Sequence, residues 1–163
     1  MDHLTDPFLI SADRFDGPVL VTGAGGCIGA WVCAILSRSG VPVIASDLQP
    51  SPARAGLVLG KQAAKALDWV SLDVTDGASV SALVSEHKIR AIIHLAGLQV
   101  PFCAANPALG ARVNVEGTIN ILEAARMREK NTKFLGGPVQ VPWRTEIWHA
   151  WHAHHLRREL SVH

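Results

Sequence analysis

The hydrophobic pattern of this chain switches repeatedly between the period of a strand and the period of a helix. The short runs PVLVT, VPVIAS, DWVSLD and RAIIHLAG are typical of strands, the first of them buried, and a helical stretch follows each of them. Because strand–helix–strand connections are right-handed, this alternation predicts an α/β protein, a doubly wound parallel sheet of about four strands with helices on both faces. The last helix is predicted to be long, to end near Lys130 and to carry the apolar stripe Leu109, Val113, Ile121, Leu122 and Ala125.

Length and composition limit the kinds of protein this chain can be. Its 163 residues, 48% apolar and 18% charged, have the size and composition of one folded domain. Fifteen basic and fourteen acidic residues give a formal charge of +1, which provides no field to attract nucleic acid or an anionic membrane. No apolar run approaches the roughly 18 residues of a spanning helix, and the start MDHLTDPFLI is acidic where a signal peptide is basic. We therefore expect a cytoplasmic protein with no nucleic-acid or membrane partner.

The three cysteines, Cys27, Cys33 and Cys103, lie inside apolar segments. An odd number of cysteines in such surroundings is unlike the disulfide framework of a secreted domain. The sequence therefore predicts reduced thiols in the core.

The glycine-rich stretch TGAGGCIG joins the first predicted strand to the first helix. Gly23, Gly26 and Gly29 have the spacing at which one glycine permits a tight turn, one lets the backbone approach a pyrophosphate, and one lets the helix pack on its strand. The N–H groups around Cys27 and Ile28 would then face phosphate oxygens at the N-terminus of the helix. This placement predicts a Rossmann-like dinucleotide site, whereas the same glycines without a second feature would indicate only a strand-to-helix turn.

The second feature is Asp47, which ends the second predicted strand 18 residues after Gly29. A carboxylate at about this offset accepts hydrogen bonds from the adenosine ribose of a dinucleotide. The same carboxylate repels a 2′-phosphate, so NAD is favoured over NADP as the cofactor. Alone, Asp47 would be interpreted as a solvated turn residue.

Three further segments follow in order along the chain: LDVTD, HLAG and NPALGARVNVEGTINILEAAR. Together with TGAGGCIG they resemble the extended short-chain dehydrogenase/reductases, in particular the NAD-dependent epimerase/dehydratase group, over about residues 18–130. The resemblance implies that Asp73 and Val74 flank the adenine ring of the cofactor. Taken singly, Asp73 would be interpreted as the cap of a turn.

The resemblance also assigns residues in the last two segments. It implies that Leu95, Ala96 and Gly97 form the loop that passes beside the cofactor after the fourth strand, and that Asn114 is the family's motif asparagine. Ala96 and Gly97 could instead serve packing alone, and Asn114 could be a polar residue on a helix surface.

The residues that perform chemistry in this family have no counterpart in the sequence. The resemblance implies hydride transfer assisted by a Tyr-x-x-x-Lys pair and a Ser or Thr, all placed after a fifth strand that is expected to begin around Lys133 to Leu135. The sequence contains no tyrosine, no lysine after Lys133, and only Thr145 and Ser161 as later hydroxyls. We therefore assign no catalytic residue and divide the chain into an N-terminal extension (1–17), a partial dinucleotide-binding domain (18–132) and a divergent tail (133–163).

The tail, expected to be helical or irregular, allows three interpretations. Its composition, rich in histidine and tryptophan, is consistent with a frameshift or truncation, and a shifted frame permits a family-like Ser-Ser segment followed by a tyrosine. It could instead be a natural divergent end, in which Trp143, Trp148 and Trp151 cover a sheet edge. A metal site at His149 and His152 is the third interpretation, although no carboxylate or thiolate joins them at fixed spacing, so no metal is assigned.

The sequence as a whole predicts the NAD-binding domain of an epimerase- or dehydratase-type oxidoreductase. The resemblance implies a parent activity at a hydroxyl carbon, in sugar-related substrates. Without the tyrosine–lysine pair we expect this chain to be inactive alone, and to take a sugar-like substrate only if further sequence completes the pocket. The alternative is a non-catalytic NAD-responsive binding module or a subunit completed by a partner chain, and a tyrosine- and lysine-bearing fragment encoded nearby would favour a split enzyme over a binding module.

Overall fold

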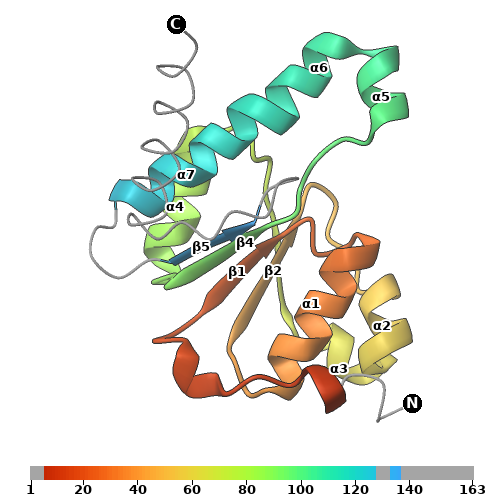
Figure 1. The fold of residues 1–163 in the computed structure, drawn as a ribbon, viewed down its shortest axis with the longest axis vertical. Helices are drawn as coiled ribbons and strands as arrows, with labels where there is room; N and C mark the ends of the chain where they lie inside the picture. Colours follow the sequence, from red (N-terminus) through yellow and green to blue (C-terminus); the bar gives the residue numbers. More distant parts are fainter. Residues whose placement is uncertain (1–5, 128–132, 137–163) are drawn as a thin grey trace, which may run out of the picture.

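The computed structural model describes residues 6–127 and 133–136, and its centre is a parallel sheet of five strands (Figure 1). The strands lie in the order β3-β2-β1-β4-β5, so the chain starts in the middle of the sheet and builds outward to both sides. Their bounds are β1 Val19–Thr22, β2 Val43–Asp47, β3 Asp68–Ser71, β4 Ala91–His94 and β5 Lys133–Gly136. This arrangement confirms the predicted doubly wound α/β fold.

The sheet lies between two layers of helices (Figure 1). One face carries α1 (Cys27–Arg38), α2 (Ala53–Leu59) and α3 (Lys61–Lys65), and the other carries α4 (Gly77–Glu86) and α7 (Gly117–Met127). Successive strand residues point to opposite faces. Thus Leu20 and Ile92 belong to the core beneath α4 and α7, whereas Val19, Val21 and Ala91 belong to the core beneath α1.

The fifth strand makes the sheet wider than the sequence pattern predicted. Lys133–Gly136 pairs in parallel with β4, from Ala91 opposite Lys133 to His94 opposite Gly136. The strand lies where the resemblance placed the family's fifth strand, inside the segment that we had assigned to the tail. A strand of four residues that ends in glycine and is followed by Gly-Pro is too short for periodicity to distinguish it from a loop.

The long helix predicted after β4 is interrupted. The structure has α5 (Val100–Ala105), α6 (Pro107–Ala111), a π-helical turn (η3, Arg112–Glu116) and then α7. Pro107 begins α6 because its ring cannot continue α5, and the π-helical turn shifts the helical register by one residue. Consequently Ile121 is buried as predicted, but Leu109 is 42% exposed, so the single apolar stripe was wrong at its start.

The N-terminal segment includes two short 3₁₀ helices, η1 (Asp6–Phe8) and η2 (Ala12–Arg14). Ile10 and Phe15 pack against the core on the α1 side, and the Ile10 N–H donates to Ser39 Oγ over 3.1 Å. The predicted extension is therefore anchored to the body of the domain.

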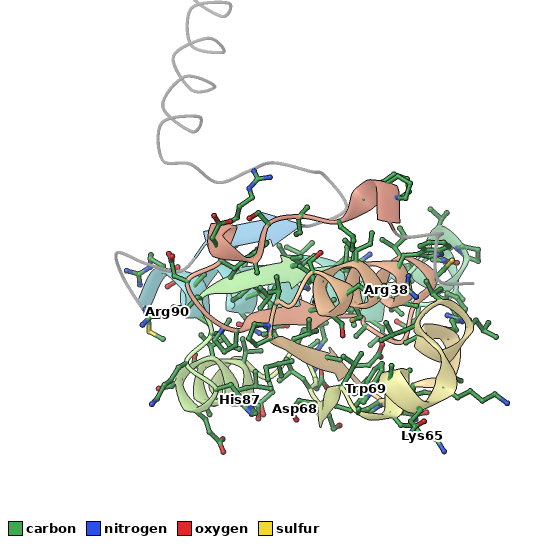
Figure 2. All side chains as sticks on the ribbon, turned by 90° about the horizontal axis from the view of Figure 1, so that it is seen from below. Arg38, Lys65, Asp68, Trp69, His87 and Arg90 are labelled. Atoms are coloured by element: carbon green, nitrogen blue, oxygen red, sulfur yellow. The ribbon has the colours of Figure 1, made fainter. Side chains whose placement is uncertain are left out.

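Two local contacts join β3 to neighbouring helical segments on the side of the sheet seen in Figure 2. His87 Nδ1, just after α4, lies 3.7 Å from Asp68 Oδ2 at the start of β3. Trp69 Nε1–H donates to the Ala64 carbonyl over 2.8 Å, which ties β3 to α3. These contacts involve the first two residues of β3 and leave the carboxyl ends of the strands free of them.

The cysteine prediction holds only in part. Cys33 is fully buried and its pKa is raised to about 12 by burial, as for an inert core thiol, and Cys103 is half-buried. Cys27 is exposed, so the prediction of a core position was wrong for it. The reason is its place at the first position of α1, where the side chain projects from the end of the helix rather than from its buried face.

The predictions made for the tail, including the histidine pair, the tryptophan cover and the frameshift, lie outside the described residues. Within residues 6–127 and 133–136, no helix is long and apolar enough to cross a membrane. The same part of the chain shows no group of three metal-ligating side chains.

Candidate functional site

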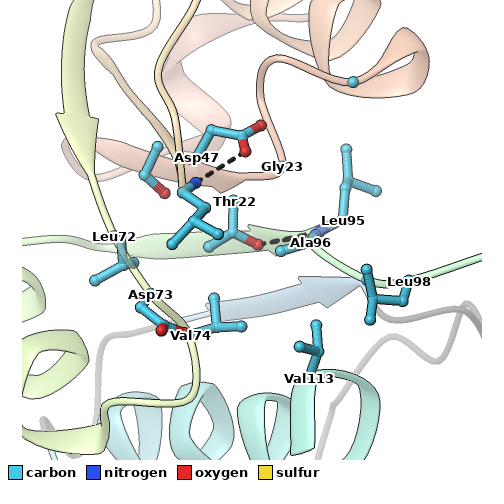
Figure 3. Close-up of a pocket in the computed structure, with 14 residues that line it drawn as sticks. Thr22, Gly23, Asp47, Leu72, Asp73, Val74, Leu95, Ala96, Leu98 and Val113 are labelled. Atoms are coloured by element: carbon cyan, nitrogen blue, oxygen red, sulfur yellow. Dashed lines mark hydrogen bonds between the residues drawn. The ribbon is translucent and has the colours of Figure 1, made fainter. Parts of the chain in front are cut away.

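A pocket of about 310 Å³ lies at the carboxyl ends of β1, β2 and β4 (Figure 3). In doubly wound sheets this is the point where the chain leaves β1 toward one side and later returns to build the other side, and ligands bind in the crevice there. The lining residues are Thr22, Gly23, Gly26, Ser46, Asp47, Leu48, Leu72, Asp73, Val74, Leu95, Ala96, Gly97, Leu98 and Val113.

The glycine turn after β1 forms the floor of the pocket. Gly23 has a φ of +69°, and a Cβ there would lie 2.7 Å from Ala96 N, so only glycine fits. A Cβ at Gly29 would collide with the Gly23 carbonyl oxygen and with the backbone of Ala24, because the first turn of α1 packs directly on the preceding turn. The predicted roles of these two glycines, a tight turn and close packing of helix on strand, agree with these contacts.

The N-terminus of α1 opens onto this floor. Its N-cap is Gly26, which has no side chain to satisfy the first N–H groups, and the first intrahelical bond runs from Ala30 N to Gly26 O over 3.0 Å. The N–H groups of the first turn therefore have no acceptor within the helix. Cys27 and Ile28 lie in this turn, and neither side chain lines the pocket, since Ile28 is 66% exposed. Only their backbone groups are suited to meet a ligand there.

Asp47 lies at the end of β2 and connects it to the glycine turn. Its Oδ2 accepts a hydrogen bond from Gly25 N over 3.0 Å, and its Oδ1 accepts one from Leu48 N over 2.8 Å. Arg54 Nη1 donates to the Gly25 carbonyl over 3.3 Å, so the Gly25 backbone is held on both sides. Each carboxylate oxygen retains a further lone pair that a hydroxyl of a ligand could use.

Asp73 and Val74 follow β3 and form the opposite wall. Asp73 Oδ1 accepts from both Thr75 N (2.9 Å) and Thr75 Oγ1 (2.8 Å), so this carboxylate stabilises its own turn while it lines the pocket. Val74 is 6% exposed and packs under α7, where a Cβ on Gly117 would come within 2.7 Å of Val74 Cγ2. The wall is thus fixed by the turn and by the helix behind it.

The loop after β4, residues 95–98, forms the third wall. The N–H groups of Leu95 and Ala96 donate to Thr22 Oγ1 over 3.2 and 3.3 Å (Figure 3). At the far end, Asn114 accepts from Leu98 N over 2.7 Å and donates to Leu98 O over 2.9 Å. Asn114 therefore lies behind the loop rather than in the lining, and it positions the loop through its backbone.

His94, the last residue of β4, is part of this site and was missed in the sequence. Its side chain is fully buried, and burial lowers its pKa to about 4. Its Nδ1 lies 2.6 Å from Thr22 Oγ1 and its Nε2 lies 3.2 Å from Thr118 Oγ1. The only signal in the sequence was a polar residue in the otherwise apolar run AIIHLAG.

The structure brings most of the predicted residues together. Those that line the single pocket described above are Gly23, Gly26, Asp47, Asp73, Val74, Leu95, Ala96 and Gly97. The others, Cys27, Ile28, Gly29 and Asn114, lie in the first turn of α1 or behind the loop. Six further lining residues were missed: Thr22, Ser46, Leu48, Leu72, Leu98 and Val113. The four apolar ones carry no chemical signal of their own, and Thr22 and Ser46 lie within strands β1 and β2.

Comparison with known proteins agrees with this geometry. The family model described as GDP-mannose 4,6 dehydratase matches residues 20–136. A UDP-glucose 4-epimerase of Klebsiella pneumoniae is 34% identical over 110 residues, which cover 66% of this chain and 79% of that sequence. The UDP-glucose 4-epimerase of Schizosaccharomyces pombe is 32% identical over 113 residues, which cover 68% of this chain and 32% of that protein.

Solved structures give the same result. The UDP-glucose-4-epimerase of Stenotrophomonas maltophila superposes with a TM-score of 0.62 at 28% identity, covering 74% of this chain and 36% of that one. The L-threonine dehydrogenase of Clostridium difficile gives a TM-score of 0.61 at 28% identity, covering 74% of this chain and 35% of that one. The chain thus spans about a third of the length of these two proteins and of the Schizosaccharomyces pombe enzyme.

The matched segment begins at β1 and ends with β5, so it contains the whole described sheet together with the pocket at its carboxyl edge. The chain therefore belongs to the NAD-dependent epimerase/dehydratase group of the short-chain dehydrogenase/reductases, and residues 20–136 form the N-terminal Rossmann segment of that family.

Proposed function

We propose that the pocket binds NAD, with the adenosine between Asp47 and the Asp73–Val74 wall, the pyrophosphate over the glycine turn, and the nicotinamide toward the 95–98 loop. The observation that carries this proposal is the convergence of three strand ends on one pocket whose floor is an uncapped helix N-terminus. The similar structures of Stenotrophomonas maltophila and Thermus thermophilus UDP-glucose 4-epimerases were solved with NAD, which supports the choice of a nicotinamide dinucleotide.

The residues present fit this cofactor. A Cβ on Gly26 would meet only the Gly23 carbonyl, at 3.1 Å, so the backbone at Gly26 is bare where a phosphate would approach. Apolar walls at Leu72 and Val74 suit an adenine ring, and the Asp47 carboxylate suits a ribose diol. When bound, NAD would supply a carbon that accepts or releases a hydride, and the described residues would bind and orient it.

The choice of NAD over NADP rests on Asp47. A 2′-phosphate would lie beside its carboxylate, and two like charges in a crevice repel each other. Arg54 contacts the glycine turn, but it donates to Gly25 O and does not line the pocket. We therefore expect weaker binding of NADP.

We also infer that these residues bind the dinucleotide without catalysing a reaction alone. Among the lining residues the side chains that carry an exchangeable proton or a charge are Thr22, Ser46, Asp47 and Asp73, which belong to the turn and to the adenosine side. The sequence supplies no tyrosine for the acid–base role. The parent activity that we propose is chemistry at a hydroxyl carbon of a sugar-related substrate, completed by sequence beyond these residues. A non-catalytic NAD-responsive module is the second candidate, and the absence of tyrosine is the observation that favours it.

Calorimetric titration of the purified chain with NAD and with NADP tests the proposal. We expect saturable NAD binding, weaker NADP binding, and loss of NAD affinity in Asp47→Ala. Asp13→Ala is the matched control, because Asp13 is an exposed carboxylate on η2, away from the pocket lining. A folded wild-type chain that fails to bind NAD would overturn the proposal, and equal binding of both dinucleotides would overturn the role of Asp47. Turnover of a nucleotide sugar by the chain alone would contradict the inferred inactivity.

A further inference from the structure

His94 sits between two threonines directly behind the pocket. Its Nδ1 is 2.6 Å from Thr22 Oγ1, at the end of β1, and its Nε2 is 3.2 Å from Thr118 Oγ1, on α7. The ring has no exposed surface, and the Thr22 side chain is 1% exposed. Both partners are uncharged hydroxyls, so the ring is neither paired with a carboxylate nor open to solvent.

The neighbours of the two hydroxyls fix the direction of each hydrogen bond. Thr22 Oγ1 accepts from the Ala96 N–H and shares the Leu95 N–H with the Thr22 carbonyl (3.1 Å), so its own proton is directed to His94 Nδ1. His94 Nδ1 is therefore an acceptor, and the proton of the neutral ring is on Nε2, which donates to Thr118 Oγ1. Thr118 in turn donates to the Asn114 carbonyl over 2.8 Å. The chain of donors and acceptors is consistent in one tautomer only.

This chain of hydrogen bonds joins the two anchors of the 95–98 loop. One anchor is Thr22, which holds the start of the loop, and the other is Asn114, which holds Leu98 through both its N–H and its carbonyl. His94 connects the Thr22 hydroxyl to the turn of helix that carries Asn114. If Nδ1 could not accept, the Thr22 hydroxyl would have to rotate, and it would then present its proton to the Leu95 and Ala96 N–H groups.

We propose that His94 is a positioning residue for dinucleotide binding, whose Nε2–H tautomer holds the Thr22 hydroxyl and thereby the 95–98 wall of the pocket. The effect of His94 on NAD affinity rests on the proposed function, whereas the assignment of the tautomer does not. His94 touches no ligand in this scheme and acts only through Thr22 and Thr118.

Two amide substitutions separate the roles of the two ring nitrogens. In His94→Asn the amide oxygen takes the place of Nδ1 and can accept from Thr22, whereas in His94→Gln the amide takes the place of Nε2 and leaves a methylene facing Thr22. Asparagine removes more volume, so His94→Asn is expected to be the less stable variant. We nevertheless expect His94→Asn to bind NAD within about threefold of wild type and His94→Gln to lose about tenfold, the size of one lost buried hydrogen bond.

The less stable variant is therefore expected to bind NAD more tightly, which a purely structural role of His94 would not produce. If NAD affinity follows urea stability across the two variants, with His94→Gln the better binder, the positioning role is overturned. Thr22→Ser should retain binding and Thr22→Val should lose it, while Thr118→Val should fall between them because it breaks the distal end of the chain. These threonine variants keep the test decisive should both histidine variants fail to fold.

The tautomer is tested without any dinucleotide. Imidazole ¹⁵N shifts of the full wild-type chain distinguish a protonated from an unprotonated ring nitrogen. We expect an unprotonated Nδ1 and a protonated Nε2 at neutral pH, and a protonated Nδ1 would overturn the proposal. Because this measurement needs no ligand, failure of the positioning role and failure of NAD binding remain distinguishable.

Discussion

Helices α1 and α4 both begin after a strand at the carboxyl edge of the sheet, yet their N-termini are closed in different ways. At α4, Asp76 Oδ1 accepts from Ala78 N (3.0 Å) and Ser79 N (3.2 Å), and Oδ2 accepts from Ser79 Oγ over 2.6 Å. The hydrogen bonds from Ser79 lower the pKa of Asp76 below its ordinary value. At α1 the N-cap is Gly26, which offers no side chain.

The difference shows at which helix N-terminus the N–H donors and the partial positive charge are available to a ligand. Both N-termini carry the partial positive charge of a helix end and donors with no acceptor in the helix. At α4 the protein supplies its own carboxylate, whereas at α1 the N-cap is Gly26, which has no side chain and lines the pocket. Helices α2 (N-cap Pro52), α3 (N-cap Gly60) and α5 (N-cap Gln99) also lack a side-chain cap, so what distinguishes α1 is that its N-cap, Gly26, lines the pocket.

Giving α1 a cap like that of α4 should produce the largest effect. In Gly26→Asp a carboxylate would occupy the N-cap, and the extended backbone there (φ −72°, ψ 172°) accepts an L residue. The new charge would lie where the pyrophosphate is proposed to bind, and we expect NAD affinity to fall about a thousandfold, as like charges brought together cost several kcal/mol. Calorimetry measures the loss.

The control for this variant is Gln62→Asp, which adds the same charge on an exposed position of α3. Its NAD affinity should match that of wild type. Circular dichroism should show that Gly26→Asp keeps its helix content. If folded Gly26→Asp binds NAD normally, the uncapped helix end is not the phosphate site, and the comparison between the two helices loses its functional meaning.

As the pH falls, we expect the protein to lose stability first through His94, behind the pocket, and only at lower pH through Asp76, the cap of α4. Burial lowers the pKa of His94 from 6.5 to about 4, so the unfolded chain takes up a proton first as the pH falls. Stability should therefore decrease from about pH 6.5 to about pH 4, by about 3 kcal/mol in total. The lowered pKa of Asp76 means that its capping contribution is present above the ordinary carboxyl pKa of 3.8 and is lost only below it.

Urea unfolding at a series of pH values measures these two losses. In His94→Gln the decrease between about pH 6.5 and pH 4 should be reduced, because the titrating ring is gone, whereas Asp76→Asn should leave that window unchanged. An unchanged slope in folded His94→Gln would show that another group dominates the acid response.

The sequence predicted best those features that depend on local pattern and backbone sterics. The residues of β1 are all buried, as an uninterrupted apolar run requires, and Gly23 has the positive φ that its place in the turn implied. Asp47 was found because a carboxylate at the end of the second strand, 18 residues after Gly29, is chemically conspicuous, whereas Asp73 was found through the family resemblance. These features need few contacts from distant parts of the chain.

The features that sequence reasoning missed depend on contacts between distant residues. Thr22 and His94 are in contact although they lie 72 positions apart in the sequence, and neither local segment predicts this contact. Asn114 was open to interpretation as a surface residue, but its amide is turned to Leu98 because the π-helical turn places it there. Leu109 was misplaced because the same turn changes the helical register, which periodicity alone does not detect.

Removing the α4 cap should affect stability and leave the pocket intact. In Asp76→Ala the N–H groups of Ala78 and Ser79 lose their acceptor, so thermal unfolding should occur a few degrees lower. NAD affinity should not change, because Asp76 lines no part of the pocket. Scanning calorimetry and a NAD titration on the same sample test both statements, with Asp76→Asn as the variant that keeps a capping oxygen. A parallel loss of affinity would show that the two helix ends are coupled.

The smallest expected effect concerns Arg54, a cation that contacts the glycine turn. Arg54 Nη1 donates to Gly25 O over 3.3 Å while Asp47 accepts from Gly25 N, so the arginine supports the turn from outside the pocket. Because the contact is one exposed hydrogen bond to an uncharged carbonyl, Arg54→Ala should lower the NAD affinity by about threefold or less. Lys65→Ala removes a positive charge from the exposed end of α3 and should change nothing. If Arg54→Ala instead weakened NADP far more than NAD, Arg54 would be reaching a 2′-phosphate, and the discrimination attributed to Asp47 would have to be shared between the two side chains.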